Sequence, residues 1–168
     1  ALGALQGCTD LRAVTLPFAG GSKTENTYLG YVFGAEYPDF AKGYYPGRLQ
    51  EVNLLEGCTA LGDYAFFECE SLRKVTLAEG IKSVGVRAFD DCDALSALAL
   101  PASLETIREN AFMDCDYLTF VTFAGENLTE IGINAFYGCL SLSEITLPDS
   151  LKALPGSCFA NCVSLKKV

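Results

Sequence analysis

The chain contains no histidine, and positive charge is scarce, with 12 lysines and arginines against 21 aspartates and glutamates in 168 residues. The missing imidazole removes the commonest general base, the commonest metal ligand and the usual titrating group near neutral pH. The formal net charge of −9 disfavours nucleic acids and anionic membrane surfaces, because like charges repel. We therefore expect no nucleic-acid partner and no histidine-based active site.

Other signals of catalysis, cofactor binding or membrane insertion are also missing. No apolar run is long enough to span a bilayer, and no basic segment precedes an apolar core at the N-terminus. The pair Gly20-Gly21 lacks the flanking pattern of a phosphate-binding loop, and no C-x-x-C pair begins a zinc site. Nucleophile activation would need a lysine or a carboxylate pair, and context marks out neither. We predict no enzyme activity, no cofactor, no metal site and no membrane insertion in this segment.

A repeated motif dominates what is present, and half of the residues are apolar, enough for a real core. Written in register, the units are "LGDYAFFECESLRKVTLAEGIKS" (61–83), "VGVRAFDDCDALSALALPASLET" (84–106), "IRENAFMDCDYLTFVTFAGENLTE" (107–130), "IGINAFYGCLSLSEITLPDSLKA" (131–153) and the truncated "LPGSCFANCVSLKKV" (154–168). The complete units therefore have 23 or 24 residues. A repeat of this length indicates stacked supersecondary units.

Each apolar position of the unit has a structural interpretation. Leu72, Val75 and Leu77 give L-x-x-V-x-L, whose end alternates with the period of a strand. The Ala-Phe pairs, such as Ala65-Phe66, mark a short helical or 3₁₀ turn in which Ala permits close approach and Phe fills the interior. One unit cannot bury its own apolar face, so copies must stack. The sequence predicts one repeat-solenoid domain over 1–168, with a parallel strand-lined sheet on one side and these turns on the other.

The pattern [IL]-G-x-x-A-F-x-x-C-x-x-L-x-x-[IV]-x-[IL]-P resembles the BspA-like leucine-rich repeat of bacterial surface proteins and some protozoan ones. The resemblance covers 61–168 and 1–16. It departs at Arg108 and Pro155, which replace Gly, and at Cys158, which replaces Ala. It implies a right-handed leucine-rich-repeat coil in an extracellular or cell-surface protein. It also implies adhesion to a protein or glycan partner, in some members a host matrix protein.

One irregular unit, at about 17–48, interrupts the repeat. The strand leucines Leu11 and Leu49 are 38 residues apart where 23 are expected. Its aromatic residues are Phe18, Tyr28, Tyr31, Phe33, Tyr37, Phe40, Tyr44 and Tyr45. Such side chains could form a small core that keeps the insertion attached, or a surface that binds protein or sugar. We favour the core and keep Tyr28, Tyr31, Tyr37, Tyr44 and Tyr45 as an alternative binding site.

Six of the eight cysteines, the slot cysteines, occupy one position of the repeat: Cys8, Cys69, Cys92, Cys115, Cys139 and Cys162. Eight cysteines in a secreted chain also suggest a disulfide framework. Equivalent positions in stacked coils point the same way, however, and small thiols act as apolar fillers. We expect reduced, buried thiols.

Acidic residues flank the same position, with Glu68, Asp91 and Asp114 before it and Glu70, Asp93 and Asp116 after it. Stacking brings these like charges into columns spaced by roughly 5 Å or somewhat more. A hard cation such as Ca²⁺ could relieve the repulsion. The alternative, which we favour, is that they are solvated or cap backbone amides locally.

The candidate partner surface is the strand face around Phe120. In L-x-x-V-x-L the residues that flank the inward Val face solvent, which places Phe120 beside Ala97, Ala99 and Thr122, with Lys74 and Glu144 at the rim. A rimmed apolar spot of this kind is a plausible anchor for a partner. The alternative, which we favour, is that Phe120 only packs across its neighbours or against a symmetry-related copy of the chain.

We expect a non-catalytic interaction or adhesion module, or alternatively a structural spacer in a longer surface protein. Ala1 lies inside a unit and Val168 precedes the third strand position, so we also expect a longer array.

Overall fold

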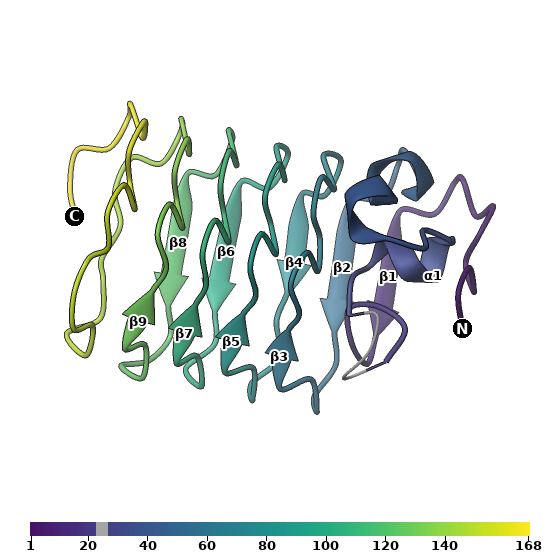
Figure 1. The fold of residues 1–168 in the computed structure, drawn as a ribbon, viewed down its shortest axis with the longest axis horizontal. Coiled ribbons are helices and arrows are strands. Elements are labelled where there is room, and N and C mark those ends of the chain that lie inside the picture. Colours follow the sequence, from purple (N-terminus) through teal and green to yellow (C-terminus); the bar gives the residue numbers. More distant parts are fainter. Residues whose placement is uncertain (23–26) are drawn as a thin grey trace.

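A computed structural model describes residues 1–22 and 27–168 of the chain. The coils stack along the long axis of the molecule, so that strands from successive repeats lie side by side (Figure 1). This arrangement confirms the expected repeat solenoid with parallel strands. No helix among the described residues is long and apolar enough to cross a membrane.

The longer strands line one face. They are β1 (Ala13–Leu16), β2 (Glu51–Leu54), β4 (Lys74–Thr76), β6 (Ala97–Leu100) and β8 (Phe120–Phe123). All pairs are parallel and their register is that of the repeat, so that Val14 lies opposite Val52 and Val52 opposite Val75. The inward valines are half-buried or buried, and the residues beside them face outward, as the alternation predicts.

A second parallel sheet runs along the other side of each coil. Its strands are β3 (Ala60–Leu61), β5 (Ser83–Val84), β7 (Thr106–Ile107) and β9 (Glu130–Ile131). These short strands contain the apolar residue at the start of each unit. The repeated Ala-Phe positions that follow form hydrogen-bonded turns and not the expected helical segments. Among the described residues, α1 (Gly30–Phe33) and η1 (Pro38–Tyr44) are the helices, and both lie in the irregular unit.

A column of stacked phenylalanine rings fills the centre of the solenoid. The rings of Phe66, Phe89, Phe112, Phe136 and Phe159 follow one another with centroids 5.0, 5.1, 5.0 and 5.4 Å apart. The paired alanines, such as Ala88, are fully buried and let the coils approach closely. The N–H of Phe66 therefore donates to the Ala88 carbonyl of the next coil at 2.7 Å. The predicted roles of both positions are confirmed.

Two positions of each regular coil have left-handed backbone. One precedes the Ala-Phe pair and the other precedes the slot cysteine, as Arg87 and Asp91 do with φ of 52° and 57°. Non-glycine residues seldom adopt this conformation, and Asn, Asp and Gly tolerate it best. This explains why the position before the cysteine is Gly7 or Gly138 in other coils.

The irregular unit folds around a small core of its own. Tyr28, Ala35 and Ala41 are buried together, and Tyr31 and Tyr45 pack against them. Helix α1 and η1 are in close contact, because a Cβ on Gly30 would lie only 2.5 Å from the Cβ of Ala41. The structural interpretation of the insertion is thus confirmed for the part that surrounds Tyr28.

Candidate functional site

Phe120 lies on the strand face with 52 % of its surface exposed. Strand β8 presents it outward because the next residue, Val121, points into the core. Ala97 is its register partner on β6, and Ala99 is the partner of Thr122. All four of these side chains are exposed, so the structure brings together the apolar spot that the sequence predicts.

The strand face is open on both sides of β6 and β8. These two strands form a separate sheet, since β4 is not paired with β6. On the other side, no backbone hydrogen bond joins β8 to 144–148 in the described chain. A hollow occupies each opening: one of about 370 Å³ lies between β4 and β6, and one of about 270 Å³ lies between β8 and 144–148. Phe120 and Thr122 line both hollows.

The charged residues at the rim of this spot differ in their pairing. Lys74 is bound to Glu51, with Nζ and Oε1 2.8 Å apart, and this hydrogen bond lowers the pKa of the Glu51 carboxyl. Glu144 is exposed and has no ion-pair partner within the described ranges. Its backbone forms an isolated parallel β-bridge with Lys167 of the next coil. Glu126 also lines the hollow beside β8, and its Oε2 accepts a hydrogen bond from the backbone N–H of Asp149 at 3.0 Å. The hollow between β8 and 144–148 is therefore acidic.

The aromatic residues of the insertion separate into two groups. Tyr28 and Tyr45 donate hydrogen bonds from their hydroxyls to the carbonyls of Ala35 and Phe67 at 3.0 and 3.1 Å, and burial raises the pKa of both phenols. Tyr31 packs edge-on against Tyr28. These three tyrosines are structural.

The second group of insertion aromatics is exposed. Tyr37, Phe40 and Tyr44 have exposed fractions of 63 %, 68 % and 45 %, and they line a hollow of about 420 Å³ with Leu2 and Gln6. Of the five tyrosines named from the sequence, only Tyr37 and Tyr44 are available to a partner. Phe40 joins them because η1 presents it on the same side.

The thiols form a column of hydrogen bonds that link the coils. The Sγ atoms of Cys92, Cys115, Cys139 and Cys162 each donate to the carbonyl of the phenylalanine one coil earlier, at 3.0–3.1 Å. All eight cysteines are reduced, and burial raises the pKa of the Cys92 and Cys115 thiols well above the usual value. The prediction was wrong for Cys8, which is exposed.

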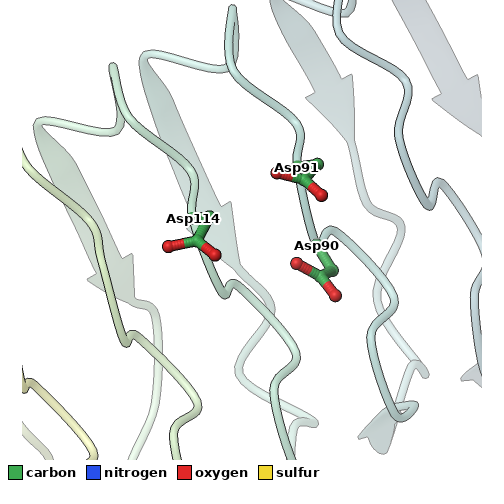
Figure 2. Close-up of side chains that lie close together, drawn as sticks. All are labelled: Asp90, Asp91 and Asp114. Carbon is green, nitrogen blue, oxygen red and sulfur yellow. The ribbon is translucent and has the colours of Figure 1, made fainter.

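An acidic cluster lies on the turn side. Carboxylate oxygens of Asp90, Asp91 and Asp114 lie within 4.8 Å of one another, and Figure 2 shows the first two on one coil and the third on the adjacent coil. Asp90 is only 2 % exposed, and its carboxylate lies 3.5 Å from the Arg87 guanidinium. Burial and, next, the charge of Asp91 raise the pKa of Asp90 to about 7. Clustered oxygens are the ligands that hard cations prefer, but Arg87 already compensates part of this charge.

Sequence reasoning identified Asp91 and Asp114 but missed Asp90. A signal was available: Asp90 occupies the position that holds Phe67, Met113 and Tyr137 in neighbouring coils. The large side chains at the equivalent positions are buried or half-buried, so an acid in this position is expected to be buried as well.

Comparisons with known proteins agree with this architecture. Residues 41–166 match the family described as BspA type leucine rich repeat region, in six copies. No curated protein sequence matches the chain.

Three solved structures share the fold. The leucine-rich-repeat protein TpLRR of T. pallidum is 33 % identical over 68 % of this chain, with a TM-score of 0.65. A leucine-rich-repeat protein of Bacteroides ovatus is 27 % identical over 96 % of this chain (TM-score 0.69), and the pneumococcal vaccine antigen PcpA is 26 % identical over 86 % (TM-score 0.68). This chain spans 56 %, 37 % and 32 % of those three chains, respectively.

Proposed function

Because this chain belongs to the BspA-type leucine-rich-repeat family, we propose that it is a non-catalytic module that binds a protein partner through the strand face around Phe120. The observation that carries the proposal is the exposed Phe120 ring between two hollows. Large aromatic side chains in such positions often supply most of the energy of an interface. Solenoids also offer the long, rigid surfaces that recognise macromolecules.

The setting that we propose is the cell surface or the extracellular space. The family match supports this, and so does the likeness to a protein described as a vaccine antigen. A host matrix protein is one partner compatible with that setting. The strongly acidic charge favours a partner with basic side chains.

The exposed insertion aromatics support a second candidate surface. Tyr37, Phe40 and Tyr44 offer stacking faces, and Gln6 adds an amide to the same hollow. Aromatic faces combined with polar tips suit either a glycan or a protein. A third possibility is a spacer with no partner, and it predicts that neither surface matters.

The first test changes Phe120 to Ala. A true anchor should lose roughly 2 kcal/mol of binding free energy, about 30-fold in affinity, while the free energy of unfolding stays nearly the same. Partner proteins from the native environment are first captured on the wild-type chain. Their dissociation constants are then measured by biolayer interferometry, alongside denaturant melts.

Ile133→Ala is the matched control, because Ile133 is 55 % exposed but lies on the turn side. Loss of affinity with Phe120→Ala alone supports the strand face. Loss with Tyr37→Ala and Tyr44→Ala instead would place the site on the insertion. Retention in all variants would place the captured partner on another surface, and capture of no partner at all would favour the spacer.

A further inference from the structure

The chemistry of the two hollows defines the kind of partner segment that the strand face accepts. This step rests on the proposed function, because it assigns a ligand class to the same surface. The hollows differ in lining, and they lie on opposite sides of the Phe120 ring.

The hollow between β8 and 144–148 suits a basic side chain. Phe120 and Phe123 line it together with Glu126 and Glu144. Lysine and arginine are attracted to the face of an aromatic ring, and carboxylates beside the ring add direct charge pairing. Glu144 is exposed and unpaired within the described residues, so it keeps its charge for a partner.

The hollow between β4 and β6 suits an apolar side chain. Its outward-facing residues Ala97 and Ala99 are small and apolar, and Thr76 and Thr122 carry methyl groups. Lys74 lies at its rim, but its ammonium already pairs with Glu51 at 2.8 Å. This opening therefore contributes little net charge, in contrast to the acidic one.

The spacing of the hollows sets the spacing of the partner's side chains. Neighbouring strands lie roughly 5 Å apart, and the hollows are two strand spacings apart, so their centres are about 10 Å apart. A polyproline II chain has three residues per turn and rises about 3.1 Å per residue, so side chains three positions apart point the same way and cover roughly this distance.

The geometry points to a protein segment in the polyproline II conformation that crosses the strands, with a lysine or arginine over Phe120 and Glu144 and an aliphatic or aromatic residue three positions away between β4 and β6. The net charge of −9 adds a long-range attraction for such a segment, weakened by salt.

Peptide display tests this partner class directly, because it selects binding segments by their side chains alone. Random dodecapeptides on phage are selected on the immobilised chain, and clones that also bind the Phe120→Ser variant are removed. The surviving sequences should carry Lys or Arg three residues from an apolar residue. A synthetic peptide from the best clone should then lose affinity at least about tenfold when its basic residue is changed to Gln.

The matched pair of protein variants is Glu144→Gln and Glu130→Gln. Both remove one negative charge, but Glu130 lies in β9 of the second sheet. We expect about a tenfold loss for Glu144→Gln and less than about twofold for Glu130→Gln, with circular-dichroism melts confirming that both variants fold.

Two outcomes separate the inference from the proposed function. Clones that depend on Phe120 but lack a basic residue, or that ignore Glu144→Gln, would overturn the partner class and leave the strand face in place. Selection that yields no clone dependent on Phe120 would overturn both.

Discussion

Four buried slot cysteines each link their coil to the preceding coil through one weak hydrogen bond: Cys92, Cys115, Cys139 and Cys162. The thiol of Cys115, for example, donates to the Phe89 carbonyl at 3.0 Å. A residue in this position must be small enough for the interior and able to donate, which cysteine satisfies with a modest desolvation cost. The column is thus more than apolar filling.

The thiols should react in two classes. Native iodoacetamide treatment should modify Cys8 rapidly, while the other seven, which are buried and reduced, should react only after denaturation without reductant. The thiols of Cys92 and Cys115 are doubly protected, because their raised pKa keeps them protonated and the thiolate is the nucleophile. Intact-mass spectrometry counts the additions. Stable disulfides between slot cysteines would contradict the structure.

Asp90 should make stability depend on pH. Its folded pKa of about 7 exceeds the unfolded value near 3.9, so the fold prefers the protonated acid. The contribution of Asp90 to the free energy of unfolding should be fully present below about pH 4 and be lost as the pH rises from there through 7, by roughly 1–3 kcal/mol. Asp90→Asn should remove that decline and raise stability at pH 8, as urea melts across pH would show.

The control is Asp149→Asn, since Asp149 is exposed. Identical pH dependence in both variants would mean that Asp90 ionises without cost. Asp91 and Asp114 act in the same direction, because burial raises their pKa as well, so some decline should remain in Asp90→Asn.

At the scale of the turns, the left-handed positions store conformational energy wherever a residue other than glycine occupies them. Glu68 precedes Cys69 with φ of 53°, in a position where the last coil has Asn161. Asparagine tolerates this left-handed backbone better than glutamate does. The backbone conformational entropy of the two residues in the unfolded chain is similar.

Glu68→Asn should therefore stabilise the fold by about 0.5–1 kcal/mol, helped by removal of one charge from the acidic column. Chemical denaturation measures the difference. Glu70→Asn is a suitable control, because it removes the same charge where no positive φ is present. This variant also loses the ion pair with Lys42, in which Nζ and Oε1 lie 2.6 Å apart, so its free energy of unfolding should not increase. Equal gains in both variants would trace the effect to charge alone.

The repeated elements could be predicted where the same residue type recurs at one position of the repeat and has the same structural role in every coil. The Phe66 and Ala65 positions are examples, because their chemistry fixes burial and close approach. The sheet of β3, β5, β7 and β9 could not, since two residues per strand are too few to show an alternation. The exposed surface of Phe120 followed from the alternation around Val121, which is why the candidate site was found.

The insertion shows the limit of that reasoning. Its sequence has no repeat partner, so nothing indicates that Tyr28 lies inside and Phe40 outside. That difference depends on how η1 folds back over α1, with Ala41 against Gly30. The pair between Lys42 and Glu70, which holds η1 to the first regular coil, joins residues 28 positions apart.

For the whole molecule, the acidic columns set the response to cations. Millimolar Ca²⁺ should change the melting temperature little beyond an equal ionic strength of NaCl. Calcium needs about six to eight oxygen ligands, and the cluster around Asp90 offers three carboxylates with Arg87 beside them. Differential scanning fluorimetry gives the comparison. A rise of many degrees that a chelator reverses would show a real calcium site.

The stacking of coils has a mechanical consequence. Each inner coil of the regular repeat is held by its two neighbours through Phe rings, thiols and strand pairs, so the bonds that join these coils lie along the long axis. Tension between the two ends would load these junctions one after another, and the solenoid would peel from its weaker end. Each unfolded unit of 23 or 24 residues would add about 80 Å of contour length. The protein would therefore lengthen under tension in steps and would not unfold in a single event.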